Sequence, residues 1–293
     1  MGILCKGSFI GAGLRATGFI SPLPRIRHSA IMTAIRLRQV QEDPNRKDIF
    51  GILNEYIQPE STTSASQAAT SFAQSVKTPN EEFFWGFWDS IFSAAEQIPH
   101  GNPAQDKLAV FVRELTLVPE TGDKVWEARV WTDLPLLGAS VRERLDEVNS
   151  TDARVPFHAF IARLLHAGVS PGSETTAIWM LREALEQDTK PTGDESESDR
   201  ALMTAAVYIE YAGATLAQKL ALQPEPQLDE AQRRLLKGGA LWKDKSGLTP
   251  DRWAFWGERF EEQGNKATSA EAKELALHAA RLIGVWAQTR VST

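Results

Sequence analysis

Tryptophans paired three residues apart are the feature that most constrains the fold of this chain. The sequence holds nine tryptophans in 293 residues. Trp85 and Trp88 form one such pair, and Trp253 and Trp256 form another. Residues three apart lie on one face of an α-helix, one turn from each other. Because indole rings bury large areas and dominate cores and binding surfaces, the pairs predict helices with aromatic faces that are covered or bind a ligand.

The hydrophobic pattern predicts helices along almost the whole chain after residue 35. The segment 80–98 is apolar over more than half its circumference, so we expect it to be buried on several sides. Residues 124–131 alternate between apolar and polar side chains, as in a β-strand. Because the sequence predicts no second strand to pair with them, an isolated extended or helical stretch is favoured. The predicted fold class is all-α, an irregular multi-helix bundle with an aromatic-rich core. The expected helices are 46–57, 61–77, 80–98, one that starts at Asn102-Pro103, 137–149, 153–167, 173–187, 199–221, 228–239, 249–263 and 268–289.

Charge is distributed unevenly along the chain. Residues 1–41 carry six basic residues and no acid, so the rest carries −12, the difference between the total of −6 and +6. An acidic body argues against nucleic-acid binding, which is driven by neutralisation of phosphates. We therefore predict a basic extension at 1–35, transit-peptide-like or disordered, before a single helical domain at 36–293 with an acidic loop near 188–200. The alternative is an over-extended gene model that truly starts at Met32.

Several features bear on the compartment. Apolar runs fall short of the roughly 18–20 residues that a membrane span needs, so we predict no span. The single cysteine, Cys5, rules out an intrachain disulfide and fits a reducing compartment. We expect an intracellular protein, in the cytoplasm by preference, and the basic extension keeps a mitochondrial location open.

No known metal or cofactor motif is present in the sequence. There is no His-Glu-x-x-His zinc helix, no Cys-x-x-Cys pair and no Walker lysine loop. His158 and His166 are eight residues apart, which is poor spacing for one site, and two histidines without a third ligand are weak evidence for zinc. We predict no metal and no cofactor.

Three side chains are candidates for catalysis. Asp89 follows Trp88 inside the most apolar segment, and a carboxyl group desolvated among rings would have a raised pKa and could act as an acid or base. Asp89 could instead face solvent or pair with an arginine. Tyr208 and Tyr211 share one face of an alanine-rich helix, where they could line a cavity with hydroxyl groups or be ordinary core residues.

Six side chains are candidates for substrate binding. Arg182 lies three residues after Trp179, a spacing that allows the guanidinium to stack on the indole ring. Structural stacking is the alternative to a role in binding. The predicted binding residues are Trp85, Trp88, Trp179, Arg182, Trp253 and Trp256.

Six short segments carry a resemblance to a known family. They are 84–89 (FWGFWD), 103–108 (PAQDKL), 131–138 (WTDLPLLG), 177–185 (AIWMLREAL), 239–243 (GALWK) and 252–256 (RWAFW). In this order they resemble a widespread fungal family of proteins that share a domain of unknown function (DUF3632). The resemblance implies a fungal source and a predominantly helical protein. It implies no activity, because the family has no general mechanism.

Two functions remain open at this stage. The first is a cofactor-independent, pericyclase-like cyclase or isomerase that acts on a hydrophobic small molecule in fungal secondary metabolism. Such a site works by holding a reactive conformer and polarising one group. The second is a helical scaffold without catalytic activity, whose protein partner is unknown. An enclosed apolar cavity of roughly 300 Å³ or more, with a few convergent polar groups, favours the enzyme. A filled core with an exposed apolar patch or groove favours the scaffold.

Overall fold

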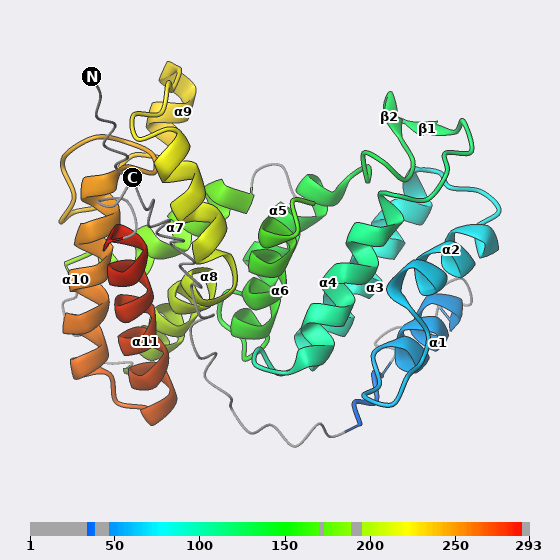
Figure 1. Cartoon of the computed structure of the whole chain (residues 1–293), viewed down its shortest axis with the longest axis horizontal. Helices are drawn as coiled ribbons and strands as arrows, with labels where there is room; N and C mark the ends of the chain where they lie inside the picture. The colour runs from blue at the N-terminus through cyan, green and yellow to red at the C-terminus, as the bar shows by residue number, and fades with distance from the viewer. Residues whose placement is uncertain (1–33, 39–46, 170–172, 189–194, 289–293) are drawn as a thin grey trace, which may run out of the picture. The chain divides into compact units, whose positions relative to one another are not determined.

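The computed structural model describes residues 34–38, 47–169, 173–188 and 195–288. Within these ranges the chain forms eleven α-helices and one two-stranded antiparallel hairpin (Figure 1). The prediction of an all-α fold is confirmed. The elements are α1 Lys47–Tyr56, α2 Ala65–Ser75, α3 Glu81–Gln97, α4 Pro103–Leu115, β1 Lys124–Val125, β2 Ala128–Arg129, α5 Leu137–Val148, α6 Arg154–His166, α7 Ser173–Leu185, α8 Glu195–Leu222, α9 Glu230–Leu235, α10 Pro250–Lys266 and α11 Ala270–Gln288.

Polar caps followed by proline start two of these helices. The side chain of Asn102 accepts a hydrogen bond from a backbone N–H in the first turn of α4, directly before Pro103. Thr249 caps α10 in the same way, directly before Pro250. Each cap satisfies a backbone donor that the helix itself leaves unpaired, and proline brings no N–H that needs a partner.

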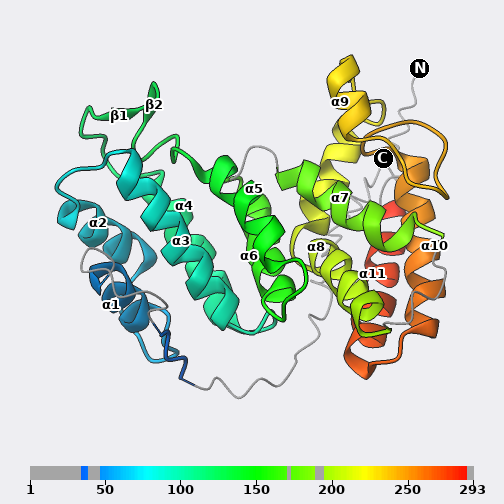
Figure 2. The same cartoon turned by 180° about the vertical axis from the view of Figure 1, so that it is seen from behind.

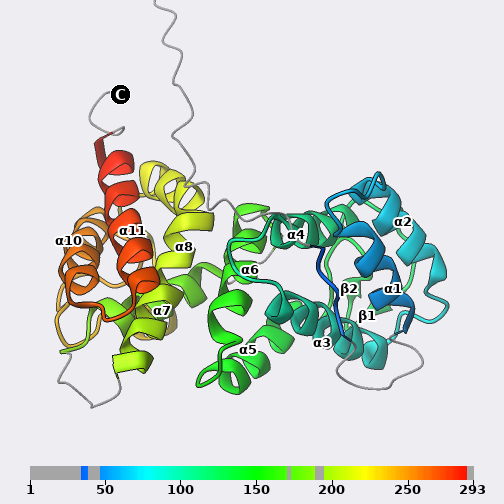
Figure 3. The same ribbon diagram turned by 90° about the horizontal axis from the view of Figure 1, so that it is seen from below.

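The long helix α8 packs against four others. It contacts α6, α7 and α11 most closely and α10 to a smaller extent, and α11 packs in turn against α10. Figures 2 and 3 show the same neighbours from behind and from below. Ala205, Ala206 and Ala212 are buried along α8, and such small side chains let neighbouring helix axes approach closely.

Rings from α2, α3, α4 and α6 form one aromatic cluster of the core. Phe87 meets Trp88 with ring centroids 4.7 Å apart, and Phe92 meets Phe157 edge-on at 5.3 Å. Trp88 is fully buried, and its Nε1 donates to the carbonyl of Pro135 at 2.7 Å. Aromatic pairs contribute about 0.5–1.5 kcal/mol each beyond the area they bury. The expected aromatic-rich core is confirmed.

Residues 124–129 form a hairpin, so the expectation of an isolated extended or helical stretch is wrong. The turn residues Trp126 and Glu127 have positive φ angles of 49° and 66°. Positive φ at both central residues defines a two-residue type I′ turn, which normally carries Asn-Gly or Asp-Gly. The Trp-Glu pair therefore gave no turn signal. The turn is held from outside, since Trp126 Nε1 donates to Glu81 Oε2 at 2.9 Å.

The segment 236–249 is a loop, although the sequence predicted that helix 228–239 would include its beginning. Arg252 donates to the carbonyls of Leu236 and Gly247 at 2.8 Å and 2.9 Å. Glu186 accepts a hydrogen bond from the N–H of Gly239 at 2.7 Å. These bonds to distant side chains pair backbone groups of the loop that a longer helix would otherwise have paired. The helix α9 therefore ends at Leu235 and not at residue 239 as predicted.

The start of α8 also differs from the prediction, because the helix begins at Glu195 rather than 199. Glu195 and Glu197 lie in its first turn, where negative charge is favourable near the positive end of the helix dipole. Residues 189–194 of the expected acidic loop and 1–33 of the basic extension lie outside the described residues. Within the described ranges, no helix combines the length and apolar character that a bilayer crossing needs.

Candidate functional site

The nine predicted site residues lie on four helices. They come from α3 (Trp85, Trp88, Asp89), from α7 and α10 (Trp179, Arg182, Trp253, Trp256) and from α8 (Tyr208, Tyr211).

On α3, Asp89 is part of an ion-pair cluster. Arg144 of α5 donates to Asp89 at 3.1 Å and to Glu96 at 2.6 Å. Burial raises the pKa of Glu96, and the bonds from Arg144 oppose this shift. The cluster attaches α3 to α5. Trp88 fills the core and Trp85 is half-buried, and no side chain of this group lines the pocket between α5, α6 and α7 that holds His158.

A fully buried ion pair accompanies the tryptophan pair of α10. Glu186, just after α7, accepts from Arg252 Nε at 2.7 Å, and neither side chain is exposed. Trp256 Nε1 donates to the same carboxylate oxygen at 2.7 Å. Trp253 is also buried, and its ring lies 6.4 Å from that of Trp256. Both tryptophans therefore belong to the core.

Trp179 and Arg182 attach α7 to the end of α9. Trp179 Nε1 donates to the carbonyl of Leu235 at 3.1 Å, and Arg182 Nη1 donates to the carbonyl of Lys237 at 3.2 Å. Both side chains are half-buried. Each also lines a pocket, Trp179 the one between α5, α6 and α7, and Arg182 a second one at the 236–249 loop.

Each predicted tyrosine of α8 is hydrogen-bonded to a histidine. Tyr208 Oη lies 2.9 Å from Nδ1 of His158, and both side chains are buried. Tyr211 Oη lies 3.3 Å from Nδ1 of His100, whose Nε2 lies 3.0 Å from Glu271. The second pair therefore has a carboxylate as third member, and the first does not.

His158 is held in the neutral form. Burial, and secondarily the positive charge of Arg154, lower the pKa of His158 to about 3. Burial also raises the pKa of Tyr208, so the phenol keeps its proton. We assign the O–H of Tyr208 as donor to Nδ1, because a buried hydroxyl proton without an acceptor is costly. This assignment places the imidazole proton on Nε2.

His158 is one of the residues that line a pocket of about 320 Å³ between α5, α6 and α7. This volume lies at the lower end of the range for small-molecule sites. Because Nδ1 is bound to Tyr208, the Nε2–H group is what the imidazole can offer to a ligand, and no other described residue hydrogen-bonds to Nε2. The other lining residues are Arg142, Leu145, Asp146, Asn149, Trp179, Met180 and Glu183.

Sequence reasoning missed the position of His158 at a pocket, because it weighed this residue only as a metal ligand. The described residues contain no group of three or more side chains that could hold a metal ion. The available signal was the helix itself, since α6 is buried along nearly all its length. A histidine in such a helix needs a polar partner, and the sequence gave no indication that Tyr208 supplies it.

Fold and pocket together define an all-α protein with a small pocket lined by His158 between three helices. The chain belongs to the family described as “Protein of unknown function (DUF3632)”, whose model matches residues 88–260. The matched region includes every residue that lines the His158 pocket. Comparisons with curated proteins and with solved structures give no match.

Proposed function

We propose that the protein is a cofactor-independent enzyme that isomerises or cyclises a hydrophobic small molecule with a carbonyl group, in fungal secondary metabolism. The observation that carries this proposal is the neutral imidazole of His158 on the pocket wall, hydrogen-bonded from behind by Tyr208.

A neutral imidazole N–H can polarise a substrate carbonyl. Because the pKa of His158 is about 3, the ring stays uncharged at neutral pH and acts as a hydrogen-bond donor. Arg154 acts in the same direction, since its positive charge disfavours an imidazolium. Fixed donors of this kind stabilise charge that develops in the transition state.

The remaining wall suits a reaction that conserves all atoms of the substrate. Trp179 and Met180 offer apolar surface that holds a reactive conformer. A cyclisation then moves only electron pairs within the substrate. An isomerisation moves one proton from a substrate carbon to the carboxylate of Asp146 and back to another carbon, while His158 Nε2–H stabilises the enolate oxygen.

The scaffold alternative receives less support. It needs a contiguous exposed apolar patch. The large exposed apolar side chains in the described part of the chain are single residues from several elements, and single exposed apolar residues are normal. They are Val110, Leu117, Trp126, Leu222, Leu235 and Leu241.

The test is conversion of an unidentified substrate in a complex extract. Purified full-length protein is incubated with a lipophilic extract of the source organism from which the gene has been deleted, and the products are compared by mass spectrometry. We expect one peak to be replaced by another of the same mass. The His158→Asn variant should not produce this change, because an asparagine amide can replace Nδ1 toward Tyr208 but does not reach the position of Nε2.

His166→Asn is the matched control. His166 lies on the same helix, is exposed and is hydrogen-bonded to Thr215 at 3.1 Å, so its replacement should leave the conversion intact. Conversion that persists in folded His158→Asn protein would overturn the assignment of His158. No conversion by the wild-type protein would favour the scaffold function.

A further inference from the structure

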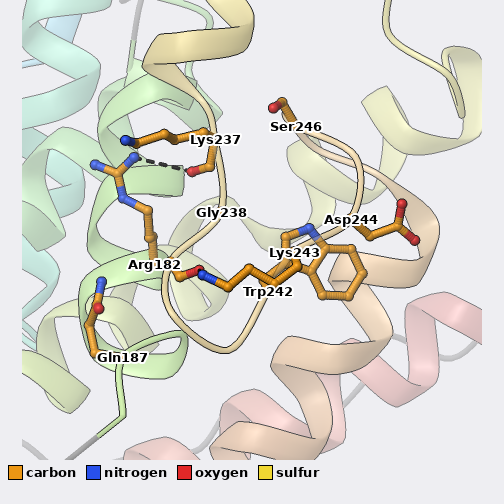
Figure 4. A pocket seen from close by; sticks show the side chains of 9 residues that line it. Arg182, Gln187, Lys237, Gly238, Trp242, Lys243, Asp244 and Ser246 are labelled. Atoms are coloured by element: carbon orange, nitrogen blue, oxygen red, sulfur yellow. Dashed lines mark hydrogen bonds between the residues drawn. The ribbon is translucent and has the colours of Figure 1, made fainter.

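A second pocket, of about 610 Å³, lies at the 236–249 loop where the loop meets the end of α7. Figure 4 shows this pocket and the hydrogen bond from Arg182 to the carbonyl of Lys237. Its lining is mostly polar. The lining residues are Arg182, Gln187, Lys237, Gly238, Gly239, Trp242, Lys243, Asp244 and Ser246.

Positive charge is concentrated in this pocket although the chain as a whole is acidic. The lining contains three cations, Arg182, Lys237 and Lys243, and a single carboxylate, that of Asp244, in a chain of net charge −6. Among the described residues, none of these three cations forms an ion pair. Lys245 of the same loop, by contrast, binds Glu225 at 2.9 Å. Unpaired cations that share a pocket raise its local positive potential and attract anions.

The loop that carries the two lysines is held in place by the buried Glu186–Arg252 pair. Glu186 accepts from the N–H of Gly239 at 2.7 Å, and its own carbonyl accepts from the N–H of Leu241 at 2.8 Å. A Cβ atom on Gly239 would lie 2.7 Å from the carbonyl oxygen of Glu186, so only glycine fits this close approach. A loop fixed in this way loses little entropy when a ligand binds.

Two further contacts order side chains of the pocket. Lys243 Nζ donates to the carbonyl of Gly239 at 3.3 Å, which folds the side chain back over the loop. Trp242 Nε1 donates to the carbonyl of Lys245 at 3.0 Å, and its ring packs against Phe255 at 5.3 Å. The half-buried indole therefore offers a fixed apolar surface beside the cations.

We propose that this pocket binds a small molecule that carries a phosphate group, with the phosphate held by Lys237, Lys243 and Arg182. A phosphate dianion matches the excess of cations better than a single carboxylate does. The indole of Trp242 contacts the organic part of the ligand. This site is separate from the pocket of His158, and its ligand does not depend on the function proposed for that pocket.

The test is calorimetric titration of the full-length protein with pyrophosphate at low salt. We expect one site per chain, and about 10-fold weaker binding in each of Lys237→Gln and Lys243→Gln, the usual effect of removing one hydrogen bond to a charged group. Asp244→Asn should bind more tightly, because it removes the carboxylate from the lining. Lys245→Gln is the matched control and should bind like the wild type.

Three results would overturn the proposal. They are the absence of saturable binding, an equal loss in Lys245→Gln, or tighter binding of citrate than of pyrophosphate, which would assign a polycarboxylate instead. Comparison of inorganic phosphate with phenyl phosphate then tests the organic part of the ligand. Tighter binding of phenyl phosphate is expected if Trp242 contacts that part, and equal binding would limit the site to the phosphate group alone.

Discussion

The two histidine–tyrosine pairs of this protein use the same chemistry in different surroundings. Tyr208 and Tyr211 are one turn apart on α8, and each is bonded to Nδ1 of a histidine. His158 is fully buried and has no carboxylate partner among the residues that the structure describes, so burial keeps it neutral. The Nε2 atom of His100, by contrast, is bonded to the largely exposed carboxylate of Glu271.

The two tyrosines also differ in the groups that pack against their rings. Tyr211 lies beneath the guanidinium of Arg163, which is 3.5 Å from the ring centroid, and Tyr208 contacts the ring of His158 edge-on. Both nitrogens of His100 already have partners, so this histidine has no ring N–H left for a ligand. His158 retains its Nε2–H. The difference teaches that the partner of the second nitrogen decides which histidine keeps a ring N–H available to a ligand.

The largest expected effect separates the two histidines by activity. We expect His158→Asn to lower turnover by about 100-fold or more, the cost of removing one fixed donor to a developing oxyanion. His100→Asn should change turnover less than about 3-fold, since the ring bonds only to protein groups. The measurement is the initial rate on the substrate identified from the extract. Equal losses of turnover in the folded His158→Asn and His100→Asn variants would contradict the different roles of the two histidines.

Removal of each hydroxyl tests what the tyrosines contribute to stability. Tyr208→Phe should lower the free energy of unfolding by about 1–3 kcal/mol, because it leaves Nδ1 of buried His158 without a partner. Tyr211→Phe should cost less than about 1 kcal/mol, because His100 keeps Glu271. Urea denaturation monitored by circular dichroism measures both. A larger loss of unfolding free energy in Tyr211→Phe than in Tyr208→Phe would contradict this prediction.

Acid should destabilise the protein through His158. The pKa of this residue is lowered from 6.5 to about 3 in the folded chain. As pH falls below 6.5, the unfolded chain therefore binds a proton that the folded chain does not, and stability falls by up to about 1.4 kcal/mol per pH unit. Urea denaturation at pH 7 and pH 5 should show a smaller pH effect in His158→Asn. An unchanged pH effect would mean that the imidazole is not desolvated.

The smallest expected effect concerns the partner of His100. Glu271 is 56% exposed at its side chain, and exposed ion pairs contribute about 0–1 kcal/mol. We expect Glu271→Gln to lower the melting temperature slightly at low salt and not at high salt. A loss as large as that of Tyr208→Phe, independent of salt, would show that the two pairs are equally desolvated.

Helix positions were predictable because local signals determine them. The apolar run at 80–98 became α3 at Glu81–Gln97, and Thr249-Pro250 became the start of α10. The errors fall where distant side chains satisfy the backbone. Glu186 and Arg252 turn the expected end of a helix into the loop of the second pocket, and Glu81 holds a hairpin turn without a glycine.

The sequence by itself determined that the tryptophans of each pair share a helix face, because a spacing of three residues fixes their direction on a helix. The sequence did not determine which residues of other helices and loops pack against that face. Only the tertiary structure decided that Trp88 and Trp256 bond to Pro135 and Glu186 within the core, and that Tyr208 meets a histidine 50 residues away. The physical reason is that hydrogen-bond partners and cavities arise between helices, and no pattern within one helix specifies its neighbour.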